Sequence, residues 1–285
     1  MRLCRFTRAD RSCGWGLLTT SGVQDISIAD PTLPIDTCEV IENWGQYATR
    51  VQYLSKRLGL SDQSLRLLPP LAKPSKVLCI GLNYRDHARE TNAPIPEEPI
   101  VFCKMPTAII GPDDPIVLPA VSTQVDFEAE LVIVIGSRIR AVDEAAASDA
   151  IWGYTVGHDV SARDWQKNKP GKQWFLGKSF DTFAPLGPAI VTADEVPDPA
   201  DLRIRCSING EIMQDGSTAD MIFKPAELVA YLSQVMTLLP GDVIFTGTPA
   251  GVGMARTPPR FLKPNDVVEI EIDGIGRLSN PCIAS

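Results

Sequence analysis

Two glutamates in the stretch DFEAELVIVIG, residues 126–136, are the first candidates for chemistry. Glu128 and Glu130 lead into an apolar run that is typical of a buried strand. Side chains two residues apart in a strand lie on the same face, so the two carboxylates repel each other unless a cation lies between them. Because a buried, unpaired carboxylate is costly to desolvate, either basic side chains or a metal ion must compensate for this pair.

A third acid, Asp159, stands at the end of a second apolar strand that begins near Gly153, in GYTVGHDVSARDWQ. Three carboxylates without cysteine form an all-oxygen site, which suits Mg²⁺, Mn²⁺ or Ca²⁺ better than zinc. Three protein ligands also leave coordination positions open for substrate and water. Asp126 lies on the same face as the glutamates, and we expect it to orient a neighbouring side chain rather than to bind the metal.

The chain has only two histidines. His87 in DHARE lies three residues before Glu90, so the two side chains share one face of a helix. A carboxylate fixes the tautomer of an imidazole and raises its basicity, so the pair could act as a general base toward water, although a solvated helix face would carry the same residues. His158 lies on the opposite side of the strand from Asp159, and we interpret it as a structural or supporting residue.

The glycine-rich turn FTGTPAGVG, residues 245–253, follows a strand. It matches neither the P-loop nor the dinucleotide-binding motif, so nucleotide binding is not expected. Thr246 and Thr248, together with free backbone N–H groups, could instead hold a small carboxylate.

The elements that must position these residues are mostly strands. Helices are expected at residues 41–58, 83–93, 143–151 and 224–242. Asn83 is the expected N-cap of the second helix. Pro225 opens the last helix, whose apolar residues stand at helical spacing: Leu228, Leu232, Val235 and Leu239. Strands are expected at residues 76–81, 100–104, 128–135 and from 153 onward, with hairpins at 14–22, at the Asn-Gly of SINGEIMQDGS and at 266–278. Because the strands pair mostly as hairpins without regular βαβ alternation, the predicted fold class is α+β and strand-rich, with a rolled sheet.

The proline-rich stretch LLPPLAKPSK cannot continue a helix and is interpreted as a linker. It predicts a small N-terminal domain of residues 1–70 and a catalytic domain of residues 71–285.

The net charge of −8 argues against nucleic acid or an anionic membrane as the main partner, so a small molecule is expected. Seven scattered cysteines fit neither a zinc site nor a disulfide framework and indicate reduced thiols. No apolar run approaches the roughly 18 to 20 residues of a membrane helix. Four arginines near the start raise the question of a mitochondrial transit peptide, but the segment runs directly into a predicted strand. We therefore predict a cytoplasmic protein, with the mitochondrial matrix as the alternative.

Seven segments in order resemble the fumarylacetoacetate hydrolase family: IGLNYRDHARE, KMPTAIIGP, DFEAELVIVIG, GYTVGHDVSARDWQ, GKSFDTFAPLGP, SINGEIMQ and PGDVIFTGTPAGVG. The resemblance extends from about Lys76 to the C-terminus, and the N-terminal region resembles the small leading domain common in that family. It implies a mixed β-sheet roll, a partly open barrel, and a homodimer.

The resemblance also implies the roles of individual residues. The implied metal ligands for Mg²⁺ or Mn²⁺ are Glu128, Glu130 and Asp159; the catalytic residues are His87 and Glu90, on a short lid helix, and Lys178; the substrate-binding residues are Arg163, Gln166 and Thr248.

The implied substrates are small 2-keto or 1,3-diketo acids, converted through an enolate that a divalent cation and Lys178 stabilise. Within the subgroup of acylpyruvate hydrolases and oxaloacetate decarboxylases, we expect C–C bond hydrolysis in which His87, assisted by Glu90, activates water. Decarboxylation or keto-enol tautomerisation of oxaloacetate-like acids at the same site is the alternative. A catalytically silent relative that only binds a ligand is the alternative from another class.

Overall fold

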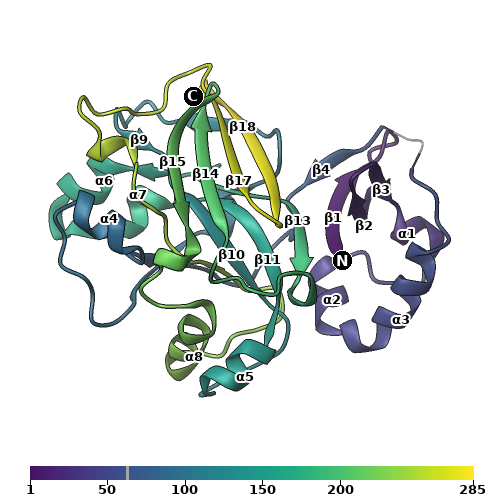
Figure 1. The fold of residues 1–285 in the computed structure, drawn as a ribbon. Helices are drawn as coiled ribbons and strands as arrows, with labels where there is room; N and C mark the ends of the chain where they lie inside the picture. The colour runs from purple at the N-terminus through teal and green to yellow at the C-terminus, as the bar shows by residue number, and fades with distance from the viewer. Residues whose placement is uncertain (62–63) are drawn as a thin grey trace.

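The computed structural model describes residues 1–61 and 64–285, and Figure 1 shows a small N-terminal region beside a larger body of packed sheets. The N-terminal region contains β1 (Arg2–Thr7), β2 (Cys13–Thr19), β3 (Gly22–Gln24), β4 (Arg66–Leu68), α1 (Ile26–Ala29), α2 (Thr37–Glu42) and α3 (Trp44–Ser55). The hairpin predicted at residues 14–22 is confirmed, because Thr19 pairs with Gly22 where β2 turns into β3.

The single helix predicted over residues 41–58 is wrong, because two helices occupy this part of the chain. α2 begins already at Thr37, since Asp36 Oδ1 accepts a hydrogen bond from the backbone N–H of Cys38. Asn43 then leaves the helical region, with φ −105° and ψ 22°, and separates α2 from α3.

The main sheet runs through both regions in the order β3-β2-β1-β13-β11-β10-β16-β5-β6. Its larger part consists of β5 (Val77–Gly81), β6 (Ile100–Lys104), β10 (Ala129–Ile135), β11 (Ile151–His158), β13 (Ala184–Thr192) and β16 (Val243–Phe245). β1 pairs with β13 through Arg2↔Val191 and Leu3↔Ile190, so hydrogen bonds cross the boundary predicted near residue 70. The division into domains of residues 1–70 and 71–285 stays a prediction.

A second sheet, in the order β15-β14-β17-β18-β8, packs beside the first. Its strands are β8 (Ile116–Leu118), β14 (Arg203–Ile208), β15 (Glu211–Ser217), β17 (Val267–Ile272) and β18 (Gly276–Ala284). Both hairpins predicted here are confirmed. Asn209 and Gly210 have φ values of 53° and 83°, the left-handed conformation that a type I′ turn requires at both central positions.

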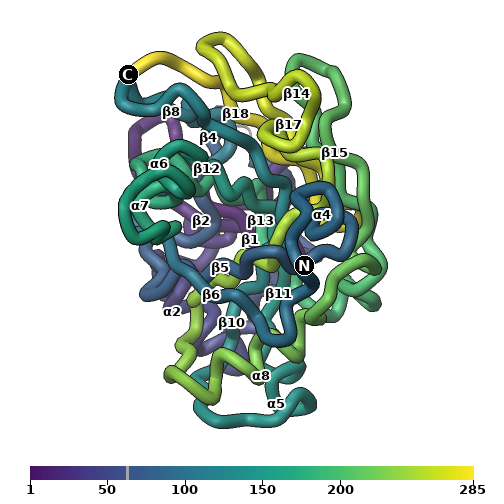
Figure 2. The backbone as a smooth tube through the Cα atoms, turned by 90° about the vertical axis from the view of Figure 1, so that its left-hand side faces the viewer, coloured from purple at the N-terminus to yellow at the C-terminus, as the bar shows by residue number. Residues whose placement is uncertain are grey.

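The remaining elements are short. They are β7 (Ile109–Ile110), β9 (Val125–Asp126), β12 (Ser161–Ala162), α4 (Arg85–Glu90), α5 (Glu144–Asp149), α6 (Arg163–Asn168), α7 (Trp174–Lys178), α8 (Pro225–Val235) and the 3-10 turns Pro106–Ala108, Pro170–Lys172, Ala193–Glu195, Thr218–Asp220 and Gly253–Ala255. Figures 1 and 2 show α5 and α8 together at one end of the molecule and α6 beside α7.

Two details of the helix predictions are wrong. Asn83 does not cap the helix that carries His87, because its buried side chain is bound to Phe223 and to the carbonyl of Thr246, and Tyr84 takes the N-cap position of α4. α8 starts at Pro225 as predicted but ends at Val235, whose side chain is 67% exposed and therefore does not extend the apolar face.

The strand-rich mixed architecture is confirmed, and in residues 1–61 and 64–285 the sheets follow open paths without closing into a barrel. β10 and β11 lie inside the main sheet and are buried along their whole lengths. Trp44 of α3 meets Trp152 of β11 edge to face, with ring centroids 5.4 Å apart, and so joins the two regions. None of the described helices combines the length and the apolar composition that a membrane span needs.

Candidate active site

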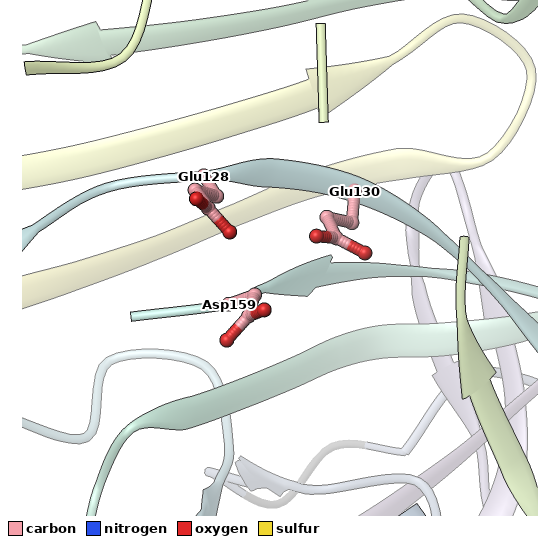
Figure 3. A group of neighbouring side chains, drawn as sticks. All are labelled: Glu128, Glu130 and Asp159. Atoms are coloured by element: carbon pink, nitrogen blue, oxygen red, sulfur yellow. The ribbon is translucent and has the colours of Figure 1, made fainter. Parts of the chain in front are cut away.

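Three carboxylates from two neighbouring strands meet at one end of the main sheet. Glu128 precedes β10 and Glu130 lies in it, while Asp159 directly follows β11; the pairing of Ala129 with His158 brings the two strand ends together. One oxygen atom from each carboxylate lies within 4.8 Å of the other two, and all three residues are buried. Figure 3 shows the three side chains pointing into the same space.

Basic side chains neutralise two of these acids. Lys178 Nζ lies 2.7 Å from Glu128 Oε2 and 2.7 Å from Asp159 Oδ2. Arg163 Nη2 lies 2.6 Å from Glu128 Oε1, and Lys104 Nζ lies 2.6 Å from Asp159 Oδ1. Burial would raise the pKa of Glu128, but the charges of Arg163 and Lys178 outweigh it and hold that pKa well below its usual range.

The third acid lacks such a partner. Glu130 Oε2 accepts a hydrogen bond of 2.7 Å from the backbone N–H of Gly247, but no basic side chain pairs with Glu130 in the described part of the chain. Burial, and then the charges of Asp159 and Glu128, raise the pKa of Glu130 well above its usual range. A buried carboxylate without a cation, beside two more carboxylates, fits a divalent metal ion with oxygen ligands.

Asp126 holds Arg163 in place, which agrees with the expectation that it orients a neighbour. Its Oδ2 accepts a hydrogen bond of 2.8 Å from Arg163 Nε, and its Oδ1 accepts one of 2.7 Å from the backbone N–H of Gly253. Arg163 Nη1 in turn donates to Gln166 Oε1 at 3.0 Å. The fork of the arginine therefore links Asp126, Glu128 and Gln166 in one buried network.

Lys104 is a site residue that the sequence reasoning missed. Its ammonium group is buried and donates to the backbone carbonyls of Val160 and Lys178 as well as facing Asp159. The signal was present in IVFCK, since strand alternation puts Lys104 on the same face as Ile100 and Phe102.

The predicted pair of His87 and Glu90 is formed on α4. His87 Nδ1 lies 2.7 Å from Glu90 Oε1, and Glu90 Oε2 accepts a hydrogen bond of 2.8 Å from the backbone N–H of Gly251. With Nδ1 donating its proton to this carboxylate, Nε2 of the imidazole is left as a proton acceptor. α4 is fixed to the neighbouring 3-10 turn because the backbone N–H of Asp86 donates to Asp220 Oδ2 at 2.7 Å.

A cavity of about 130 Å³ connects these groups. Its polar lining consists of His87, Thr91, Glu128, Glu130, Arg163, Gln166, Lys167, Lys178 and Thr248. Its apolar wall includes Ile80, Leu82, Phe102, Trp174 and Met254. Of the residues predicted for the site, Glu90 and Asp159 do not line the cavity, but they contact His87 and Lys178, which do.

The two threonines of the glycine-rich turn differ. Thr248 lines the cavity, and its Oγ1 accepts a hydrogen bond of 2.8 Å from Gln214 Nε2, which leaves its hydroxyl hydrogen free to donate. Thr246 has no free donor for a ligand, because both its hydroxyl and its backbone N–H donate to the carbonyl of Leu131 in the sheet. The suggestion that Thr246 could hold a carboxylate is therefore wrong.

His158 does not reach the cavity lining. Burial, reinforced by the positive charge of Lys104, lowers the pKa of His158 to about 3. It is therefore neutral at physiological pH, as suits a buried supporting residue.

Comparisons with known proteins find relatives of similar sequence and structure over nearly the whole chain. The family model described as fumarylacetoacetate (FAA) hydrolase C-terminal matches residues 76–283. A mitochondrial oxaloacetate tautomerase of Xenopus laevis is 48% identical over 289 residues, which cover 99% of this chain and 90% of the relative. A fumarylacetoacetate hydrolase from psychrophilic Exiguobacterium antarcticum has a similar structure, with a TM-score of 0.89, 37% identity and full coverage of both chains. A maleylpyruvate hydrolase from Sphingobium sp. SYK-6, solved in complex with manganese(II) ion and pyruvate, matches with a TM-score of 0.83, 30% identity and full coverage of both chains.

Proposed function

Because the chain belongs to the fumarylacetoacetate hydrolase family, whose enzymes act on keto acids, we propose that it interconverts the keto and enol forms of an oxaloacetate-like 2-keto acid with the help of a divalent metal ion. The observation that carries the proposal is that one cavity is lined by His87 and by the carboxylates of Glu128 and Glu130. A proton acceptor and a metal-binding group thus face the same small space. The name of the frog relative, an oxaloacetate tautomerase, supports tautomerisation.

The proposed metal ligands are Glu128, Glu130 and Asp159. When bound, a divalent ion supplies a Lewis acid that polarises the keto oxygen and lowers the barrier to enolisation. Mg²⁺ and Mn²⁺ both suit three carboxylate ligands, and the manganese-bound relative supports a divalent ion of this kind.

Enolisation needs a base at C3 and a proton at the C2 oxygen. We assign the base to His87 Nε2: it takes the C3 proton, the C–H electrons form the C2–C3 double bond, and the C=O π electrons move to the C2 oxygen. That oxygen then takes the proton back from the imidazolium through a water molecule, which regenerates the neutral imidazole. Glu90 stabilises the imidazolium that forms, because its carboxylate accepts the Nδ1–H. The Lys178 ammonium stabilises the negative charge that develops on the oxygen, and the free hydroxyl hydrogen of Thr248 suits the substrate carboxylate.

Hydrolysis of a C–C bond, which the sequence favoured, is the second candidate. Two observations support it: the maleylpyruvate hydrolase with a similar structure, and a His87–Glu90 pair that could equally activate water. Decarboxylation of oxaloacetate passes through the same enolate. The alternative of a silent ligand-binding relative is less favoured, because three carboxylates lie together and His87 is hydrogen-bonded to Glu90.

The test follows the ultraviolet absorbance of enol-oxaloacetate as the protein converts it to the keto form, with Mg²⁺ or Mn²⁺ and with a chelator. Pyruvate release and cleavage of acetylpyruvate and fumarylpyruvate are measured in parallel, and the same metal without protein gives the background. We expect faster enol decay that the chelator removes and that Glu130→Gln abolishes. Cleavage of an acylpyruvate without acceleration of enol decay would replace the first candidate by the second.

The homodimer stays a prediction. The cytoplasm stays the predicted location; the word mitochondrial in the name of the frog relative supports the mitochondrial alternative.

A further inference from the structure

Lys167 is a cation of the cavity for which the proposed reaction has no use. It follows Gln166 in the last turn of α6, lines the cavity and is exposed at its mouth. Its side chain forms no hydrogen bond and no ion pair with any residue of 1–61 and 64–285. An ammonium group is therefore available to a ligand in the cavity.

The other basic groups of the site are occupied. Lys178 lies between Glu128 and Asp159, and Lys104 is bound to Asp159 and to two carbonyls. Arg163 uses its three nitrogens on Asp126, Glu128 and Gln166. A substrate anion that is not held by the metal and needs a basic side chain would have to break one of these buried pairs or use Lys167.

The surroundings of Lys167 agree with its proximity to the reacting end of the cavity. Desolvation, followed by the charge of Arg163, lowers its pKa from the ordinary lysine value. The charges of Glu128 and Asp126 act in the opposite direction without reversing the shift, and a bound carboxylate would add to their effect.

We propose that Lys167 binds the distal carboxylate of a 2-keto dicarboxylate and thereby makes the enzyme prefer dicarboxylates over 2-keto acids with a neutral distal end. This inference rests on the proposed function, because it assumes that the 2-keto acid end of the substrate lies at Glu128, Glu130 and Lys178. It adds a specificity residue to that site.

The alternative role for Lys167 is purely structural, since a cation in the last turn of a helix stabilises the carboxyl end of that helix. The two roles predict different effects of a Lys167 substitution on different substrates. A structural lysine would affect all substrates alike, whereas a carboxylate-binding lysine affects only those that carry the second charge.

The experiment compares oxaloacetate with its 4-methyl ester, which lacks the distal charge, in the wild type and in Lys167→Gln, Lys167→Arg and Lys172→Gln. Lys172 is exposed and does not line the cavity, so its variant has the same change of net charge. For Lys167→Gln we expect kcat/KM toward oxaloacetate to fall about tenfold, mainly through KM, because an accessible charge-assisted hydrogen bond is lost. Toward the ester we expect a change of less than about twofold, with Lys167→Arg restoring most of the loss and Lys172→Gln resembling the wild type.

The proposal would be overturned if Lys167→Gln lowered kcat/KM equally for oxaloacetate and for the ester. It would also be overturned if Lys172→Gln lowered kcat/KM for oxaloacetate as much as Lys167→Gln does. A binding measurement separates this failure from failure of the proposed reaction. Calorimetry compares 2-oxoglutarate with 2-oxopentanoate, which has the same number of carbons but no second carboxylate. The wild type should bind the dicarboxylate more tightly, and Lys167→Gln should bind the two acids with similar affinity. That result would support the role of Lys167 even if no enol conversion were found, whereas equal binding of both acids by the wild type would refute it.

Discussion

Glu128 and Glu130 have the same side chain and point to the same side of the chain at the start of β10 (Figure 3), yet their surroundings differ. Glu128 forms ion pairs with Arg163 and Lys178, while Glu130 has one backbone hydrogen bond and no basic partner among the described residues. The protein thus stabilises one charge itself and leaves the other to a bound cation. This difference can be measured in the absence of metal.

We expect Glu130→Gln to abolish metal-dependent turnover but to leave the metal-free protein as stable as the wild type, or more stable. The amide retains an acceptor for the N–H of Gly247 and removes a charge that is costly to bury. Glu128→Gln should instead lower the free energy of unfolding by about 2 to 4 kcal/mol, because Arg163 and Lys178 each lose a buried partner. Urea unfolding with chelator present measures both variants, and equal destabilisation of the two would contradict the assignment.

His87→Asn and Glu90→Gln are expected to lower kcat by about 10² to 10⁴, the usual contribution of a positioned proton acceptor. Metal affinity should change little, since neither residue belongs to the carboxylate triad. Stopped-flow measurement of enol decay checks the loss of kcat, and calorimetric metal titration checks the metal affinity. Arg89→Gln, at an exposed position of the same helix, is the control and should retain full activity.

Helix α1 offers a test of pH dependence away from the site. Its N-cap residue Asp25 accepts hydrogen bonds from the backbone N–H of Ile28 and from Arg8, with Arg8 Nε at 2.7 Å from Oδ2. Burial raises the pKa of Asp25, but the hydrogen bonds from Arg8, Ser27 and Ile28 outweigh it and place that pKa below its usual range. The charged form of Asp25 therefore stabilises the fold above the ordinary pKa of about 3.9, and this stability is lost as the pH falls through the lowered value.

We expect Asp25→Asn to lower the free energy of unfolding at pH 7 by about 1 to 3 kcal/mol, since asparagine retains the cap but not the charge. The difference in free energy of unfolding between Asp25→Asn and the wild type should disappear as the pH falls below about 4. Denaturant unfolding at several pH values measures it. Asp36→Asn is the matched control, because Asp36 caps α2 without an ion pair in the described part of the chain, and it should show no such gap.

Local patterns were enough to predict the strand that follows Glu128 and contains Glu130, the helix face that joins His87 to Glu90, and the Asn-Gly hairpin. Each depends on residues close together in the sequence. Partners far along the chain could not be predicted in the same way. Lys104 meets Asp159 across 55 positions, and Asn83 is held by Phe223 and Thr246, so only the folded sheet shows that one completes the site and the other cannot cap a helix.

The continuity of the main sheet bears on the predicted domains. Removing residues 1–70 would leave β13 without β1 and would uncover its buried residues Ile190 and Val191. We therefore expect a fragment of residues 71–285 to aggregate or to unfold at a lower temperature than the full chain. Size-exclusion chromatography and thermal unfolding measure this. A monodisperse, active fragment would instead support two independent domains.

The edge-to-face contact of Trp44 and Trp152 gives the junction between the regions an optical signature. Two indoles with ring centroids 5.4 Å apart are close enough for their strong far-ultraviolet transitions to couple, so we expect an exciton couplet in the far-ultraviolet circular dichroism spectrum. Trp174 lines the cavity instead, so we expect its signal to follow ligand binding. Loss of the couplet in Trp44→Phe would identify it, and its melting curve would then report when α3 separates from β11, independently of enzyme turnover.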